Sequence, residues 1–193
     1  RHARYRREPS LSEKALLPLL KAIVAGGAQD DLARVLAFVQ EAPSEFRLDE
    51  CQVPCLNAII PWSRKKFGKT PAEIAHWLAT VRQRLSDVTR HQPEPPADWV
   101  RPAEVACKCQ LCGQLNTFLA DARNEFGRIA AREDLRRHLL DKIDRHLCDV
   151  KHTLDRSRSP FALVFTKTTG SYERALKQYE SDCRLLQSLP ATE

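Results

Sequence analysis

Three cysteines lie within six residues of one another in the stretch ACKCQLCG. They are Cys107, Cys109 and Cys112, separated by Lys and Gln. Three thiols this close cannot all form local disulfides with good geometry, and no apolar periodicity requires them as core residues. Thiolates on a short turn can instead surround one zinc ion, and the neighbouring Lys108 favours the thiolate form. The spacing therefore predicts a metal site that binds zinc.

A tetrahedral zinc site needs a fourth donor from a distant part of the chain. The candidates are His138, His146, Cys148 and His152. His138 is predicted on the flank of an apolar helical stripe, where it can reach a site beside the core, whereas His146 is predicted within that stripe. We expect His138 to be the fourth ligand, with His146 and Cys148 as alternates. A closed Cys3His shell has no open position, so the site would be structural and coupled to folding.

Other chemical patterns in the chain are weaker. The stretch SRKKFGKT ends like a phosphate-binding P-loop, but Ser63 occupies the position that requires glycine. Cys148 beside a histidine could act as a nucleophile, but no acid partner or oxyanion loop is recognisable. Cys51 and Cys55 are four residues apart and suit the core of a helix better than a second metal site. We therefore expect no enzymatic activity in this chain.

Seven basic side chains are candidates for contact with nucleic acid, four in the stretch SRKKFGK and three near a predicted hairpin. They are Arg64, Lys65, Lys66, Lys69, Arg156, Arg158 and Lys167. The first group surrounds an aromatic residue and suits a phosphate backbone, although a solvated loop is the alternative interpretation. A formal net charge of +6 favours polyanionic partners mildly.

The segment 10–92 is predicted to form a helical bundle. Apolar residues repeat at helical spacing in three long segments, 10–27, 29–43 and 69–90. A shorter helix is expected to begin near Pro54 and to stop at Pro61. The basic residues 1–9 are expected to be a tail or linker.

A proline-rich connector, residues 93–104, is expected to lead into a zinc-binding α+β module over 105–193. Strong four-residue periodicity predicts a helix over 133–148. Period-two alternation then predicts a β-hairpin, roughly 149–156 paired with 161–167, before a closing helix. The predicted fold class is mainly α, an N-terminal helical bundle plus a small zinc-stabilised α+β module.

The composition places the chain among globular proteins, with 29% charged and 42% hydrophobic residues. No apolar run is long enough to span a bilayer, and no signal-peptide pattern is present. Clustered cysteines favour a reducing, intracellular compartment, either cytoplasmic or nuclear. The chain begins with Arg and contains no Met, so we expect it to be a fragment of a longer polypeptide.

Three segments between residues 97 and 188 carry a resemblance to a known family. DWVRPAEVACKCQLCGQLNTFLAD, RRHLLDKI and SPFALVFTKTTGSYERALKQ together resemble the C-terminal cysteine-rich, zinc-binding region attached to some bacterial and fungal two-oxoglutarate/iron(II) oxygenase-like proteins. The resemblance implies Cys107, Cys109, Cys112 and His138 as the ligand set, and no activity for this chain. The His-x-Asp/Glu motif of an oxygenase iron site is absent from the sequence.

These observations predict a non-catalytic, zinc-stabilised binding module of a larger intracellular protein, which contacts nucleic acid through basic surfaces. The alternative is a protein-interaction or scaffolding domain that positions an upstream catalytic, oxygenase-like domain. Salt-dependent binding to mixed DNA or RNA distinguishes the two.

Overall fold

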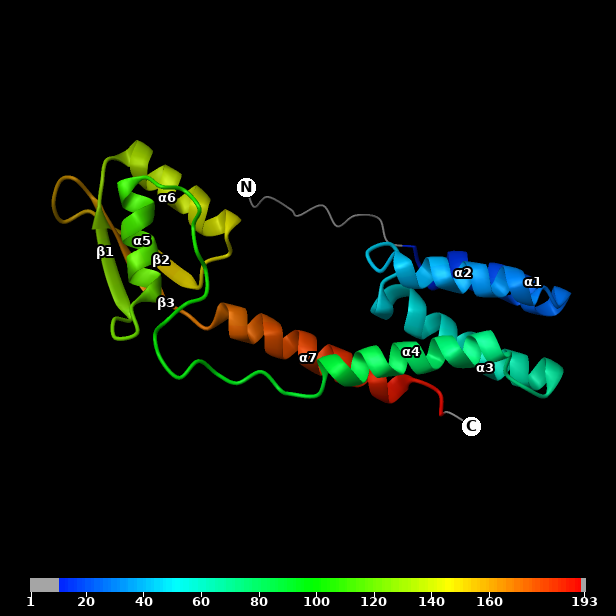
Figure 1. Cartoon of the computed structure of the whole chain (residues 1–193). Coiled ribbons are helices and arrows are strands. Elements are labelled where there is room, and N and C mark those ends of the chain that lie inside the picture. Colours follow the sequence, from blue (N-terminus) through cyan, green and yellow to red (C-terminus); the bar gives the residue numbers. More distant parts are fainter. Residues whose placement is uncertain (1–10, 192–193) are drawn as a thin grey trace. The chain divides into compact units, whose positions relative to one another are not determined.

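The computed structural model describes residues 11–191, so the expected basic tail over residues 1–9 lies outside the described part. The chain divides into two compact units, both drawn in Figure 1. One unit runs to Gln92 and resumes at Tyr179, and the other comprises Pro93–Gln178. The predicted class, mainly helical with a small β module, is confirmed.

The proline-rich segment and the C-terminus are grouped differently from the expected ranges. The proline-rich segment belongs to the second unit, where the backbone N–H groups of Trp99 and Arg101 donate to the carbonyls of Ala122 and Leu119. The residues from Tyr179 onward belong to the first unit, because Leu189 is buried in its core.

The first unit is built from helices that each bury an apolar stripe in one common core. They are α1 (Glu13–Gly26), α2 (Gln29–Glu41), the π-helical turn η1 (Leu48–Gln52), α3 (Val53–Phe67), α4 (Ala72–Val88) and the C-terminal part of α7 (Gly170–Ser188). The fully buried Trp77 donates its indole N–H to the side-chain oxygen of the buried Gln52, at 3.2 Å. Within residues 11–191, no helix combines the length and apolarity needed to cross a membrane.

The expectation that the third helix stops at Pro61 was wrong, because α3 continues to Phe67. Ile60 and Ser63, on either side of the proline, are both fully buried. The Ser63 hydroxyl also donates to the Ile60 carbonyl at 2.9 Å. Burial of this face outweighs the backbone hydrogen bond that a proline removes. Gly68 caps the end of the helix with a φ of 74°, a left-handed conformation that glycine adopts readily.

The second unit combines helices with a three-stranded antiparallel sheet. Its elements are α5 (Gln110–Ala120), β1 (Phe126–Ala130), α6 (Glu133–Arg145), β2 (Val150–Asp155), β3 (Ala162–Lys167) and the beginning of α7. The strand order is β1-β3-β2. The predicted hairpin is confirmed, since β2 pairs with β3 from Val150 opposite Lys167 to Asp155 opposite Ala162. Strand β1 was not predicted.

The core of the second unit lies between its two helices and the central strand. Phe165 and Leu163 of β3 are buried against Leu115 of α5 and Leu139 of α6. Gly127 of β1 packs against the ring of Phe118 of α5, and a Cβ atom at this position would lie only 2.7 Å from the ring. Glycine at this position therefore lets α5 pack closely on the sheet.

Candidate metal centre

The side chains predicted as metal ligands come together in the second unit. Cys107 precedes α5, Cys109 is the residue immediately before its first turn, and Cys112 lies in that turn. His138 comes from the middle of α6. The ligand atoms of all four residues lie within 4.8 Å of one another. This Cys3His cluster could hold a metal ion.

The one nitrogen and three sulfur donor atoms of the cluster surround a common centre. The His138 Nε2 atom lies 3.5 Å from the Cys107 Sγ, 3.6 Å from the Cys109 Sγ and 3.5 Å from the Cys112 Sγ. One ring nitrogen can direct its proton or its lone pair at only one sulfur. Three nearly equal distances are therefore poorly explained by hydrogen bonding alone, and they suit donors that share one central ion.

The packing of α5 against α6 sets the positions of the two innermost ligands. Cys112 is fully buried and belongs to the same core as Leu115, three residues along α5. On α6, Leu139 is fully buried beside His138, which is itself half-buried. The core packing thus orients the two helices, and it places Cys112 within the core and His138 at its edge.

A side chain that sequence reasoning missed fixes the segment before Cys107. The Asn116 side-chain amide on α5 accepts from the backbone N–H of Val105 and donates to its carbonyl, both at 2.9 Å. This pair of bonds holds the incoming chain against α5 two residues before the first ligand. The available signal was an Asn in the interior of a predicted helix, where that residue is intrinsically unfavourable.

The thiols of Cys109 and Cys112 differ in how readily they ionise. The backbone N–H of Cys112, followed by its side chain, lowers the pKa of Cys109 to about 6. Burial raises the pKa of Cys112 to about 12. Cys109 is exposed and sits at the N-terminus of α5, where the helix dipole favours a thiolate. A bound cation would provide the charge compensation that the buried Cys112 thiolate needs.

The alternates for the fourth position lie outside the cluster. Helix α6 ends at Arg145, and the chain turns through Leu147 at a φ of 48°. His146 is therefore exposed, which corrects the expectation that it lies in the apolar stripe. Cys148 is a buried member of the second core, and burial raises the pKa of its thiol. Among the described residues, the four-residue cluster with His138 is the group that could bind a metal ion.

Lys167, expected to contact nucleic acid, is not a surface residue. It is only 3% exposed, and its ammonium group donates to the Asp121 carbonyl. The same group stands 4.6 Å from the centre of the Phe118 ring. Burial lowers the pKa of Lys167. We therefore remove Lys167 from the set of candidate contacts.

The other six basic residues lie in two groups, one in each unit. Lys65, Lys66 and Lys69 are exposed around the end of α3, whereas Arg64 is partly buried and bonds the Thr70 hydroxyl at 3.1 Å. Arg156 and Arg158 are exposed in the turn between β2 and β3.

The comparison of the chain with known proteins finds no match to a family model, a curated protein or a solved structure.

Proposed function

We propose that the chain is a non-catalytic binding module whose second unit is stabilised by one zinc ion. The supporting observation is the set of 3.5–3.6 Å distances from the His138 Nε2 atom to three sulfurs. A tetrahedral zinc ion with ordinary Zn–S and Zn–N bonds places the nitrogen ~3.6 Å from each sulfur. The nitrogen–sulfur distances are therefore compatible with one shared zinc ion.

The donor types also favour zinc. Three thiolates and one imidazole are soft or borderline ligands, whereas Mg²⁺ and Ca²⁺ require oxygen donors. Four protein ligands fill a tetrahedral shell and leave no position for water or substrate. A catalytic role for the ion is therefore disfavoured, and its contribution is to hold α5 and α6 together.

Elemental analysis of the purified, reduced full chain tests this assignment. We expect about one equivalent of zinc, and its loss in Cys109→Ser and His138→Ala. His146→Ala, which alters an exposed histidine just beyond the same helix, is the matched control and should retain the metal. Less than about half an equivalent in the unmutated chain, or unchanged zinc in His138→Ala, contradicts the site as assigned.

Nucleic acid is the partner that we propose, and the contact surface is a lysine–aromatic patch on the first unit. The patch comprises Lys21, Lys65, Lys66, Lys69, Trp62 and Phe67. The Lys66 ammonium lies 5.3 Å from the Trp62 ring and 5.4 Å from the Phe67 ring, and Lys21 lies 5.6 Å from the Trp62 ring. Phe67 is 42% exposed. Cations beside one exposed and one partly buried ring suit the phosphates and bases of a single strand.

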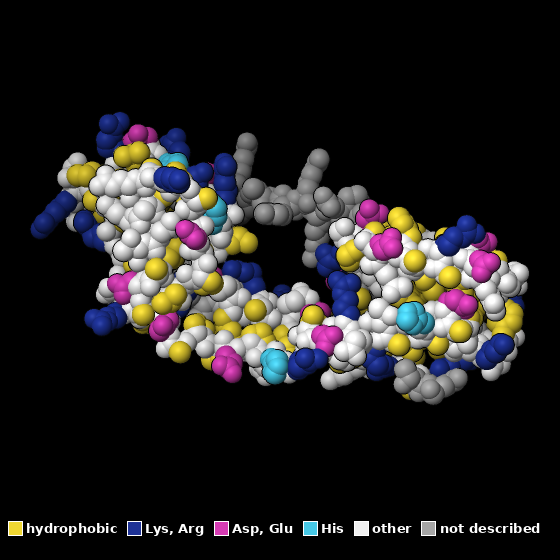
Figure 2. Space-filling view, in the orientation of Figure 1, with side chains coloured by type: hydrophobic (Ala, Val, Ile, Leu, Met, Phe, Trp, Pro, Cys, Tyr) yellow, Lys and Arg dark blue, Asp and Glu magenta, His cyan; other side chains and the backbone are white. Residues whose placement is uncertain are grey.

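Figure 2 shows carboxylates interspersed with lysines and arginines on the visible face of each unit. On that face, affinity should therefore depend on a local patch and not on a broad positive field. Three phosphate contacts to a single strand would weaken binding about 20-fold between about 50 and 200 mM salt.

Fluorescence anisotropy with a labelled single-stranded oligonucleotide measures this affinity. Lys66→Glu should weaken binding about tenfold, whereas Lys14→Glu, which changes an exposed lysine of α1 outside the patch, should have a much smaller effect. If no binding occurs even at about 50 mM salt, the nucleic-acid partner is rejected, while the zinc assignment is decided by its own measurement.

A further inference from the structure

Strand β2 lies at the edge of the sheet, and part of its core-facing side is uncovered. β3 pairs with one of its edges, and no strand of residues 11–191 pairs with the other. The register places His152 opposite Phe165 and Leu154 opposite Leu163, so each pair points to the same face of the sheet. Phe165 and Leu163 are buried, yet His152 is exposed and Leu154 is 39% exposed. The helices therefore cover β3 and leave β2 open.

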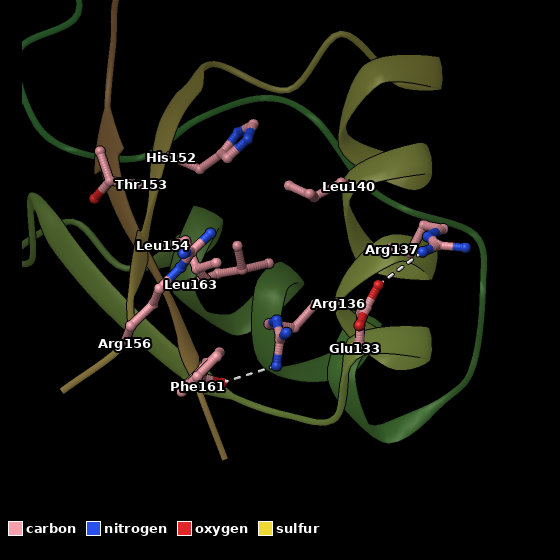
Figure 3. A pocket seen from close by; sticks show the side chains of 10 residues that line it. All are labelled: Glu133, Arg136, Arg137, Leu140, His152, Thr153, Leu154, Arg156, Phe161 and Leu163. Carbon is pink, nitrogen blue, oxygen red and sulfur yellow. Dashed lines mark hydrogen bonds and ion pairs between the residues drawn. The ribbon is translucent and has the colours of Figure 1, made fainter. Parts of the chain in front are cut away.

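A groove of about 550 Å³ occupies this gap between α6 and β2. Figure 3 shows Leu140 of α6 and His152 of β2 directed into the space between the two elements. Leu154 and Leu163 contribute further apolar surface to the lining. The groove thus offers an apolar floor beside the open edge of a strand.

The lining of the groove is predominantly cationic, with three arginines against a single carboxylate. Arg137 pairs with that carboxylate, Glu133, at 2.8 Å, and Figure 3 shows the Arg137 guanidinium directed away from β2. Arg136 donates to the carbonyls of Ala131 and Phe161, but its charge remains at the groove. Arg156 is exposed and forms no hydrogen bond or ion pair within residues 11–191. Its guanidinium is available to an anionic partner.

We infer that this groove binds an extended acidic segment of a partner protein, which adds as a strand to the outer edge of β2. His152 and Leu154 alternate along β2 and therefore line the same side, and Arg156, directly after the strand, lines the same groove. A complementary strand presents acidic, apolar and acidic side chains at alternate positions, Glu-x-Val-x-Glu. This pattern reads the same in both directions, so it fits parallel and antiparallel addition. Main-chain hydrogen bonds supply affinity, and the side chains supply specificity.

A peptide fits this groove better than a nucleic acid strand does. Phe161 is the only Phe, Tyr or Trp side chain in the lining, so the groove offers few rings on which successive bases could stack. The open backbone edge, in contrast, matches only another extended polypeptide. The inference goes beyond the proposed nucleic-acid function and concerns the other unit.

The test uses a fluorescent peptide, Ser-Thr-Glu-Thr-Val-Thr-Glu-Thr-Ser, titrated with the zinc-loaded full chain. We expect saturable binding that Arg156→Glu weakens by at least about tenfold. Arg158→Glu, in the same turn but outside the groove, is the matched control and should change affinity less than about twofold. A peptide with Pro at the two positions beside Val should lose at least about tenfold, because proline removes the N–H groups needed for strand pairing.

Amide NMR shifts locate the bound peptide. The peptide should shift the resonances of Lys151–Asp155 and slow the hydrogen exchange of their amides, with smaller shifts on α6. The inference is overturned by absence of binding, by equal effects of Arg156→Glu and Arg158→Glu, or by shifts elsewhere. It is also overturned if a single-stranded oligonucleotide occupies β2 in place of the peptide. Zinc content and oligonucleotide affinity, measured on the same sample, show whether the proposed function fails separately.

Discussion

The two units of the molecule differ in how much apolar surface they bury. Among the described residues, the first unit gathers 18 buried residues in one core, including Trp77, whereas the second gathers 10. One of those 10 is the candidate ligand Cys112, and the sheet leaves β2 largely uncovered. Small cores commonly require a metal ion or a disulfide for stability. We therefore expect the first unit to fold by apolar burial alone and the second to depend on its ion.

Removal of the metal should produce the largest difference between the units. A structural zinc ion contributes on the order of 10 kcal/mol of binding free energy to a folded domain. Treatment with a strong chelator should therefore abolish the hydrogen-exchange protection of β3, Ala162–Lys167, and leave that of α3 and α4 in place. Zinc added back should restore the lost protection. Equal loss in both units, or in neither, would contradict the comparison.

A cavity in the first core should have the reverse effect. Leu56 of α3 is fully buried, so Leu56→Ala should destabilise the first unit by about 2–5 kcal/mol. Zinc content and β3 protection should remain those of the unmutated chain, because neither depends on this core. Denaturant unfolding followed by NMR reports each unit separately. Metal loss in Leu56→Ala would show that the two folds are coupled.

A smaller effect should separate the ligands of the cluster from other buried thiols. Cys148 lies in the second core but outside the cluster, so Cys148→Ala should cost about 1 kcal/mol and retain zinc. Cys112→Ala, the matched substitution at a buried ligand, should lose the ion. Elemental analysis and thermal unfolding of both variants make this measurement. Zinc loss in Cys148→Ala would restore that residue as a ligand.

The smallest expected effect concerns acid and the first unit. The hydrogen bond from Arg47 lowers the pKa of Asp49 below its usual value of 3.8. The stabilisation is therefore present above that value and is lost as the pH falls below it. The pair is exposed, so we expect at most about 1 kcal/mol. Chelator-treated Asp49→Asn should lose less stability than the parent chain between about pH 5 and pH 3. If the variant loses more stability than the parent chain over this pH range, the Asp49 carboxylate does not stabilise the first unit.

The sequence predicted most of the candidate site because its signals are local. Three cysteines in six residues indicate a site by themselves, and helical periodicity places His138 on the flank of a packed helix. The hairpin could also be predicted, because the alternation in 161–167 matches the burial pattern of β3. In contrast, the end of the His138 helix depends on the turn at Leu147, so periodicity alone extended it too far and misplaced His146.

The missed features depend on tertiary packing. Strand β1 buries only Ile129, so its five residues lack the alternation that identifies a strand. The sequence suggests that Lys167 is an exposed cation, but the pairing of β3 and the contact with the Phe118 ring bury it in the second unit. Asn116 acts through two hydrogen bonds to a residue eleven positions earlier, which a single sequence does not reveal.

The second unit is an insertion between two pieces of the first, and this arrangement has a consequence for synthesis on the ribosome. Residues 93–178 are contiguous and are complete before the first unit receives its last core residue, Leu189. The hydrogen bond from the Arg82 guanidinium to the Pro190 carbonyl can likewise form only after this last segment has been synthesised. The inserted unit can therefore fold before the unit that begins the chain is complete. We expect the availability of zinc to affect the nascent chain at that stage.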